Sequence, residues 1–135
     1  MEEYIKKLTR ANWVEVNLDA IKNNFGKLRE MVGSDIKIMP AVKSNAYGHG
    51  ILECGRVLEQ CGADYMGIGS VEEGIALRKY GIKAPLLIFA SNTLVDVADI
   101  YVKWDLIPTV MYEFQGKAVS EAALAAGKKD YPVFI

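Results

Sequence analysis

Strand-like and helix-like segments alternate along this chain, and that alternation is the feature that most limits how it can fold. Six short runs are typical of strands: residues 13–18, 36–42, 65–69, 85–90, 106–110 and 131–135. Segments with helical spacing of apolar residues separate these runs. Strands that alternate with helices predict parallel strands joined by right-handed crossovers. The chain is therefore expected to be an α/β protein.

Apolar stripes and capping residues mark the expected helices. One stripe follows Asp19, and a second follows the glycine-rich segment near residue 50. The stripe positions are Ile21, Phe25, Leu28 and Val32, and then Ile51, Cys54, Leu58 and Cys61. Ser70 and Glu73 form a capping-box pattern that predicts a helix start. Glycines that favour a left-handed C′ position follow the helical runs at Gly33, Gly62, Gly81 and Gly127.

Two architectures agree with this order of elements. A five-stranded flavodoxin-like sheet would be complete in 135 residues, whereas a (β/α)8 TIM-type barrel needs about 250 residues and would be half present. Length favours the flavodoxin-like sheet. The strand-like run at 131–135 favours the barrel, because no helix follows to cover it and it would leave an unpaired edge. In that case the inner faces of about five strands would lie open to water.

Composition excludes several classes of partner. The net charge is −1 with acidic and basic residues scattered, so no basic stripe is present and nucleic acid is not an expected partner. Residues 1–10 lack the apolar region of a signal peptide, and no apolar run approaches the roughly 18 residues of a membrane span. Cys54 and Cys61 are too far apart on one helix to form a disulfide and are expected to pack in the core. We expect a cytoplasmic protein without a membrane partner.

The segment AVKSNAYGHG, residues 41–50, is the leading candidate for a functional site. Lys43 directly follows an apolar strand-like run, and both architectures place ligand sites at the carboxyl ends of parallel strands. A lysine in partly apolar surroundings loses its proton more readily, and its amine can then attack a carbonyl carbon. The alternative is a surface lysine whose stem packs on apolar neighbours while its amine stays in water.

Two further residues of this segment carry polar groups. Tyr47 lies four residues after the lysine, where its hydroxyl can reach an anion held nearby, or where the ring only packs. His49 is the one histidine of the chain, and a lone histidine is expected to be a hydrogen-bonded loop residue. We predict no metal site, because neither a second histidine nor a cysteine lies beside it. The segment contains neither a Walker A nor a dinucleotide-binding pattern.

The same ten residues resemble the lysine motif of the alanine racemase family, in which a short apolar strand precedes a valine-lysine pair and Ala-Tyr-Gly-His-Gly. Residues 10–30 and 62–91 are also similar to the opening strand and helix and to the second and third βα units of that family. The resemblance implies that residues 1–135 are a partial N-terminal (β/α)8 barrel domain without the C-terminal β domain. It also implies a pyridoxal 5′-phosphate enzyme that works as a homodimer.

By this resemblance, Lys43 forms the imine with the cofactor and acts as one catalytic base, and Tyr47 hydrogen-bonds the cofactor phosphate. The implied reaction interconverts L- and D-alanine and supplies D-alanine for cell-wall peptidoglycan. The second base of the family is a tyrosine in the C-terminal domain of the partner subunit, so the chain alone is expected to be inactive. Two alternatives remain open: a racemase of the same family for serine or basic amino acids, and a non-catalytic half-barrel that binds cofactor or self-associates.

Overall fold

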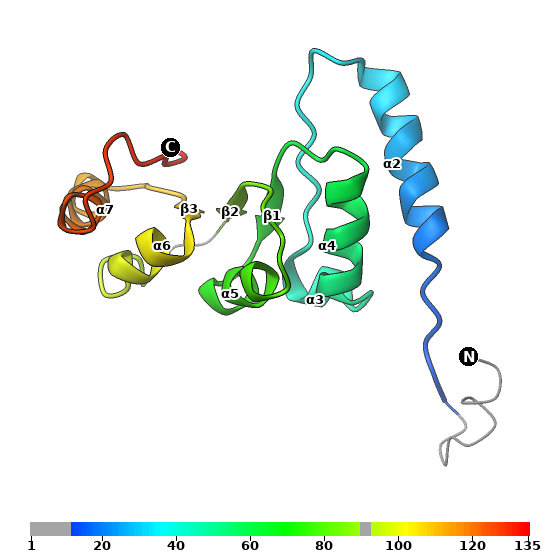
Figure 1. Ribbon diagram of the computed structural model, residues 1–135, viewed down its shortest axis with the longest axis horizontal. Helices are drawn as coiled ribbons and strands as arrows, with labels where there is room; N and C mark the ends of the chain where they lie inside the picture. Colours follow the sequence, from blue (N-terminus) through cyan, green and yellow to red (C-terminus); the bar gives the residue numbers. More distant parts are fainter. Residues whose placement is uncertain (1–11, 90–92) are drawn as a thin grey trace.

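Three short parallel strands form the centre of the molecule (Figure 1). The computed structural model describes residues 12–89 and 93–135. The strands are β1 (Met66–Ile68), β2 (Leu86–Ile88) and β3 (Leu106–Pro108). They pair in the order β1-β2-β3, with Met66 opposite Leu86 and Leu86 opposite Leu106. These strands confirm the predictions at 65–69, 85–90 and 106–110, apart from Ala90, which lies outside the described residues.

Two further segments join the sheet through one isolated bridge each. Ala41 pairs with Gly67 on the outer side of β1, and Phe134 pairs with Thr109 just after β3, both in parallel. The predicted strands at 36–42 and 131–135 are therefore present as single bridges, so the five expected parallel segments consist of three strands and two bridges. Pro40 contributes to this outcome because it has no N–H group to donate to a neighbouring strand.

The order of these segments decides between the two architectures. All five pair with their neighbours in chain order, which is the order of a (β/α)8 barrel. A flavodoxin-like sheet would instead place its second strand at the edge, in the order 2-1-3-4-5. The flavodoxin-like alternative is therefore wrong, and the described residues form part of a (β/α)8 barrel.

Helices follow the strand segments and pack on one face of the sheet, whereas the helix that precedes them stands away from it. In chain order, the helices are α2 (Leu18–Val32), α3 (Lys43–Tyr47), α4 (Ile51–Gln60), α5 (Val71–Lys79), α6 (Ala98–Trp104) and α7 (Glu113–Ala125). The four glycines predicted at C′ positions all have positive φ angles, between 70° and 95°. Within the described residues, none of these helices is both long and apolar enough to cross a bilayer.

Helix α2 differs from the prediction in where it begins and in which of its apolar residues are buried. It begins at Leu18, with the Asn17 side chain accepting a hydrogen bond from the Ala20 N–H at 2.9 Å, so the predicted strand at 13–18 does not form. Asn17 therefore caps the helix, and Asp19 lies in its first turn. In the predicted apolar stripe Phe25 is buried, whereas Leu28 is 51% exposed. The reason is that α2 packs against α4 and stands away from the sheet (Figure 1).

The core lies between the strands and the helices that follow them. Leu77 of α5 is fully buried there together with alternate strand residues, which are Met66, Ile68, Leu86, Ile88 and Leu106. Leu87 points to the other face of the sheet, because neighbouring strand residues alternate in direction. It is only 3% exposed. The expectation that the inner faces would lie open to water is therefore wrong for β2.

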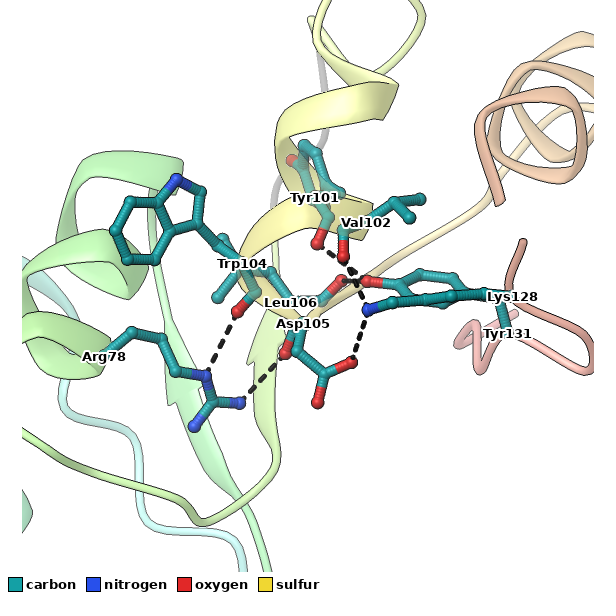
Figure 2. Close-up of polar contacts among 8 residues, drawn as sticks. All are labelled: Arg78, Tyr101, Val102, Trp104, Asp105, Leu106, Lys128 and Tyr131. Atoms are coloured by element: carbon teal, nitrogen blue, oxygen red, sulfur yellow. Dashed lines mark hydrogen bonds and ion pairs between the residues drawn. The ribbon is translucent and has the colours of Figure 1, made fainter. Parts of the chain in front are cut away.

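A polar cluster closes the end of the sheet where the strands begin (Figure 2). The Arg78 guanidinium donates to the Trp104 and Asp105 carbonyl oxygens at 3.2 and 2.9 Å, and thereby joins α5 to the end of α6. The Tyr131 hydroxyl lies 2.7 Å from the Tyr101 carbonyl oxygen and 2.9 Å from that of Leu106. These contacts link successive βα units at the amino end of β3, which leaves the carboxyl ends of the strands to the candidate site.

Candidate functional site

Lys43 lies at the carboxyl end of the sheet, as the sequence predicts. It lies two residues after the bridge between Ala41 and Gly67 and is the first residue of α3. Its side chain is half-buried, and its Nζ lies 5.7 Å from the centre of the Phe89 ring, which comes just after β2. An aromatic face at this distance attracts a cationic amine. The half-buried lysine therefore has an aromatic neighbour at the carboxyl ends of the strands.

The residues after Lys43 form a left-handed helical turn. Ser44, Asn45, Ala46 and Tyr47 have φ angles of 53°, 55°, 52° and 53°. The sequence predicts a loop at this position, and a regular turn of the opposite hand to an ordinary α-helix takes its place. Each non-glycine residue in this conformation costs roughly 1 to 2 kcal/mol. Four in succession therefore require contacts with the rest of the chain to hold them.

Several hydrogen bonds supply part of that support. The Ala46 N–H donates to the Val42 carbonyl oxygen at 2.8 Å, and the Gly50 N–H donates to the Asn45 carbonyl oxygen at 3.0 Å. The Asn45 side chain accepts from the Ile51 N–H at 2.9 Å. This last bond caps α4, whose N-cap residue Gly50 has no side chain to do so. The turn is thus fixed to the strand segment before it and to the helix after it.

Tyr47 ends the turn and is 60% exposed. Its position leaves the ring and hydroxyl accessible on the same short element that carries Lys43. His49 has its Nδ1 atom 2.8 Å from the Ala46 carbonyl oxygen, to which it donates in the Nδ1–H tautomer. This contact confirms the interpretation of His49 as a hydrogen-bonded loop residue. Across the described part of the chain, no group of three or more potential metal ligands is present.

Glu73 is the site residue that sequence analysis missed. Its Oε1 accepts a hydrogen bond from the Asn45 N–H at 3.0 Å, and its Oε2 accepts one from the Gly69 N–H at 2.9 Å. The predicted capping box is therefore half right. Ser70 Oγ does accept from the Glu73 N–H at 3.3 Å, but the Glu73 carboxylate reaches Gly69 instead of the Ser70 amide. A capping-box pattern in the sequence gives no sign of the second partner, which lies 28 residues away.

This arrangement has a limited and specific chemistry. The Lys43 amine is a nucleophile that can bond to a carbonyl carbon when it is neutral. A tyrosine hydroxyl such as that of Tyr47 can donate to an anion. Both groups stand on one turn at the carboxyl ends of parallel strands, where barrel enzymes place their active sites. The site therefore fits a ligand that combines an aldehyde or ketone with an anionic group.

Comparison with known proteins gives one consistent family. The family model described as alanine racemase, N-terminal domain, matches residues 16–135. Alanine racemase 1 of Caldanaerobacter subterraneus subsp. tengcongensis is 40% identical over 120 residues, which cover 89% of this chain and 31% of that protein. Alanine racemase 2 of Bacillus subtilis is 48% identical over 88 residues, or 65% of this chain and 22% of that protein.

Solved structures agree with these relatives. Alanine racemase from Clostridium difficile 630 superposes with a TM-score of 0.85 at 32% identity, covering 91% of this chain and 32% of that one. Alanine racemase from Bacillus anthracis with bound L-Ala-P superposes with a TM-score of 0.74 at 33% identity, covering 87% and 29%. The chain thus spans about a third or less of the length of the proteins it matches.

Proposed function

The chain belongs to the alanine racemase family, and on that premise we propose that it is part of a pyridoxal 5′-phosphate-dependent enzyme that interconverts L- and D-alanine. The observation that carries this proposal is the position of Lys43. Its half-buried amine lies beside Phe89 at the carboxyl end of the sheet, on a turn fixed at both ends. A lysine that only snorkels at the surface needs no such fixed support.

The groups of this site fit the cofactor. The Lys43 amine is suited to a covalent bond with the cofactor aldehyde, and the exposed Tyr47 hydroxyl is suited to its phosphate. When bound, the cofactor withdraws electrons from the Cα atom of an amino acid, so that an ordinary base can remove the Cα proton. Once the amino group of the substrate has displaced it, the free Lys43 amine would be such a base, and in this proposal it removes or returns that proton on one face of Cα.

Racemisation also requires a base on the opposite face, because a single base that returns the proton where it took it changes nothing. We assign no residue of this chain to that task. The family implies a tyrosine from the C-terminal domain of a partner subunit. The proposal therefore includes a homodimer and a C-terminal β domain, both on family grounds alone. It also keeps the cytoplasmic location expected from the sequence.

Racemisation of alanine by the protein that carries this chain tests the proposal. Purified protein with pyridoxal 5′-phosphate should form D-alanine from L-alanine, and should act on serine and on lysine much more slowly. The variant Lys43→Ala should lose the activity, because the nucleophile and one base are removed together. Lys37→Ala is the matched control, since Lys37 also lies over an aromatic ring, 5.5 Å from the centre of Tyr65. Full activity in Lys43→Ala, or faster turnover of serine or lysine than of alanine, would contradict the proposal.

A further inference from the structure

Glu73 joins three parts of the site through one carboxylate. It stands in the first turn of α5, and its two oxygens bind the N–H groups of Asn45 and Gly69. Asn45 belongs to the left-handed turn that follows Lys43, and Gly69 follows β1 directly. Hydrogen bonds to a charged acceptor are among the stronger ones in proteins. The carboxylate therefore fastens the turn to the carboxyl end of the neighbouring strand.

Gly69 brings this contact close to the lysine. A Cβ atom added at Gly69 would lie 3.3 Å from the Lys43 Cβ and 3.4 Å from the Glu73 Oε2. The first distance is tighter than most contacts of a Cβ atom, and the second is close to an ordinary van der Waals contact. The absence of a side chain at residue 69 therefore lets the lysine stem approach closely. The Cβ atom of Lys43 thus packs against Gly69, whose N–H donates to Glu73.

The left-handed turn explains why such a contact is needed. Each of its four non-glycine residues lies in a conformation that costs free energy when it is unsupported. The Asn45 N–H is in the middle of the turn, and its acceptor comes from α5 rather than from the turn itself. We propose that Glu73 is a positioning residue for Lys43: its carboxylate holds the left-handed turn so that the lysine amine faces the cofactor. This inference rests on the proposed function and adds a residue to it.

Hydrogen exchange in Glu73→Gln tests the contact itself. An amide side chain offers one acceptor oxygen, and its NH2 group would face an N–H donor, so one of the two backbone amides loses its acceptor. Hydrogen exchange at the amide of Asn45 or Gly69 should become roughly 10-fold faster or more, because that amide loses a hydrogen bond to a charged group. Glu72→Gln is the matched control, because it removes the same charge from the same turn of α5 and Glu72 is exposed. Unchanged exchange at both amides in Glu73→Gln would overturn the inference.

Covalent labelling tests whether the contact positions the lysine. The protein is incubated with pyridoxal 5′-phosphate and reduced with borohydride, and the pyridoxyl group on Lys43 and on Lys37 is counted by peptide mass. Glu73→Gln should slow labelling of Lys43 several-fold, while labelling of Lys37 and the midpoint of unfolding stay as in Glu72→Gln. Gly69→Ala should slow labelling of Lys43 in the same way with the carboxylate still present, which keeps the test valid if Glu73→Gln folds poorly.

The outcomes separate this inference from the proposed function. Faster exchange in Glu73→Gln with an unchanged ratio of Lys43 to Lys37 labelling would make Glu73 a structural residue only and overturn its positioning role. Preferential labelling of Lys43 in the unaltered protein would leave the proposed function standing in that case. Equal labelling of Lys43 and Lys37 in the unaltered protein would overturn the proposed function and the positioning role together.

Discussion

The ring of Phe89 occupies the space that a side chain at Gly67 would need. A Cβ atom built on Gly67 would collide with the Phe89 Cζ and Cε2 atoms. Gly67 is the central residue of β1, and Phe89 is the aromatic neighbour of the Lys43 amine. The glycine in β1 therefore allows the ring that follows β2 to lie across the sheet, beside the candidate nucleophile.

This relationship predicts that substitutions of Gly67 and Phe89 have coupled effects on stability. Gly67→Ala should destabilise the fold by about 1 to 3 kcal/mol, because the new methyl group displaces the Phe89 ring. In the background of Phe89→Ala the same substitution should cost much less, and the difference measures the coupling between the two residues. Denaturant unfolding of the unaltered protein, the two single variants and the double variant provides the four free energies.

The control is Gly26→Ala in the middle of α2, where an added Cβ meets no atom within 4 Å. It should stabilise the fold by about 0.5 to 1 kcal/mol, since alanine favours helix over glycine. Equal effects of Gly67→Ala with and without the Phe89 ring would show that the clash is relieved in another way.

Tyr47→Phe tests the proposed phosphate contact. The substitution removes a hydroxyl that can donate to a charged group, and such a bond contributes roughly 1.5 to 3 kcal/mol, or about 10- to 150-fold in affinity. Equilibrium titration of the protein with pyridoxal 5′-phosphate should show a weaker affinity of that order. Binding of pyridoxal, which lacks the phosphate, should change little. An equal loss for both ligands would assign Tyr47 to packing and not to the phosphate.

The raised pKa of Tyr131 predicts that the stability of the fold falls at alkaline pH. Burial, and next the nearby Asp105 charge, raise the pKa of the Tyr131 hydroxyl well above its ordinary value. Below about pH 10 tyrosine is protonated in both the folded and the unfolded chain. Above that pH the unfolded chain loses the proton first, so the stabilisation contributed by Tyr131 declines as the pH rises toward the folded-state pKa.

Tyr131→Phe should therefore cost about 1 to 2 kcal/mol near neutral pH, because the two part-buried carbonyl oxygens beside the hydroxyl lose the one proton that it donates (Figure 2). The difference from the unaltered protein should shrink between about pH 10 and pH 12. Urea unfolding at a series of pH values measures it, with the exposed Tyr47→Phe variant as control. A constant difference across that range would contradict the direction of the pKa shift.

The contacts of Asp64 predict that the stability of the fold falls at acid pH. The Ile38 N–H donates to its carboxylate at 2.8 Å and the Arg29 guanidinium at 2.7 Å, and these contacts lower the pKa of Asp64. A lowered pKa means that the stabilisation is complete above the unfolded-state value, about pH 4, and is lost as the pH falls through the folded-state pKa. Asp64→Asn should therefore destabilise the protein at pH 7 and matter progressively less below pH 4.

Thermal unfolding at pH 7, 4 and 3 checks this prediction. Asp35→Asn is the matched control, because Asp35 is exposed and its carboxylate accepts a hydrogen bond from the adjacent Ser34. An Asp64→Asn variant as stable as Asp35→Asn at pH 7 would show that the contacts to Ile38 and Arg29 add nothing.

Local patterns predicted the parts of the fold that depend on neighbouring residues. The Ser70 cap and the positive φ of Gly62 follow from side-chain chemistry within one turn, and both are confirmed. The strands at the two sides of the sheet were overestimated, since an apolar run such as 36–42 shows burial but not how many of its backbone groups find a partner. The strand order, which excludes the flavodoxin-like sheet, arises from long-range pairing that no local pattern contains.

The position of the candidate site was predicted from the sequence, but the contacts that hold it were not. The position of Lys43 follows from an apolar run that ends in a lysine, and the structure places it as expected at the carboxyl end of the sheet. The left-handed turn was not foreseen, because Ser44, Asn45 and Ala46 are not residues that generally favour such a run. The contact from Glu73 was missed for the same physical reason, since it crosses between elements that meet only in the folded chain.

Mapping of the lysine that bonds to the cofactor tests the central claim most directly. The protein that carries this chain is saturated with pyridoxal 5′-phosphate, reduced with borohydride and digested, and the modified peptide is identified by mass. We predict one pyridoxyl group, on Lys43, and its loss in Lys43→Ala with no new site of modification. A pyridoxyl group found instead on Lys37 or spread evenly over the exposed lysines would contradict the assignment of Lys43 and, with it, the proposed function.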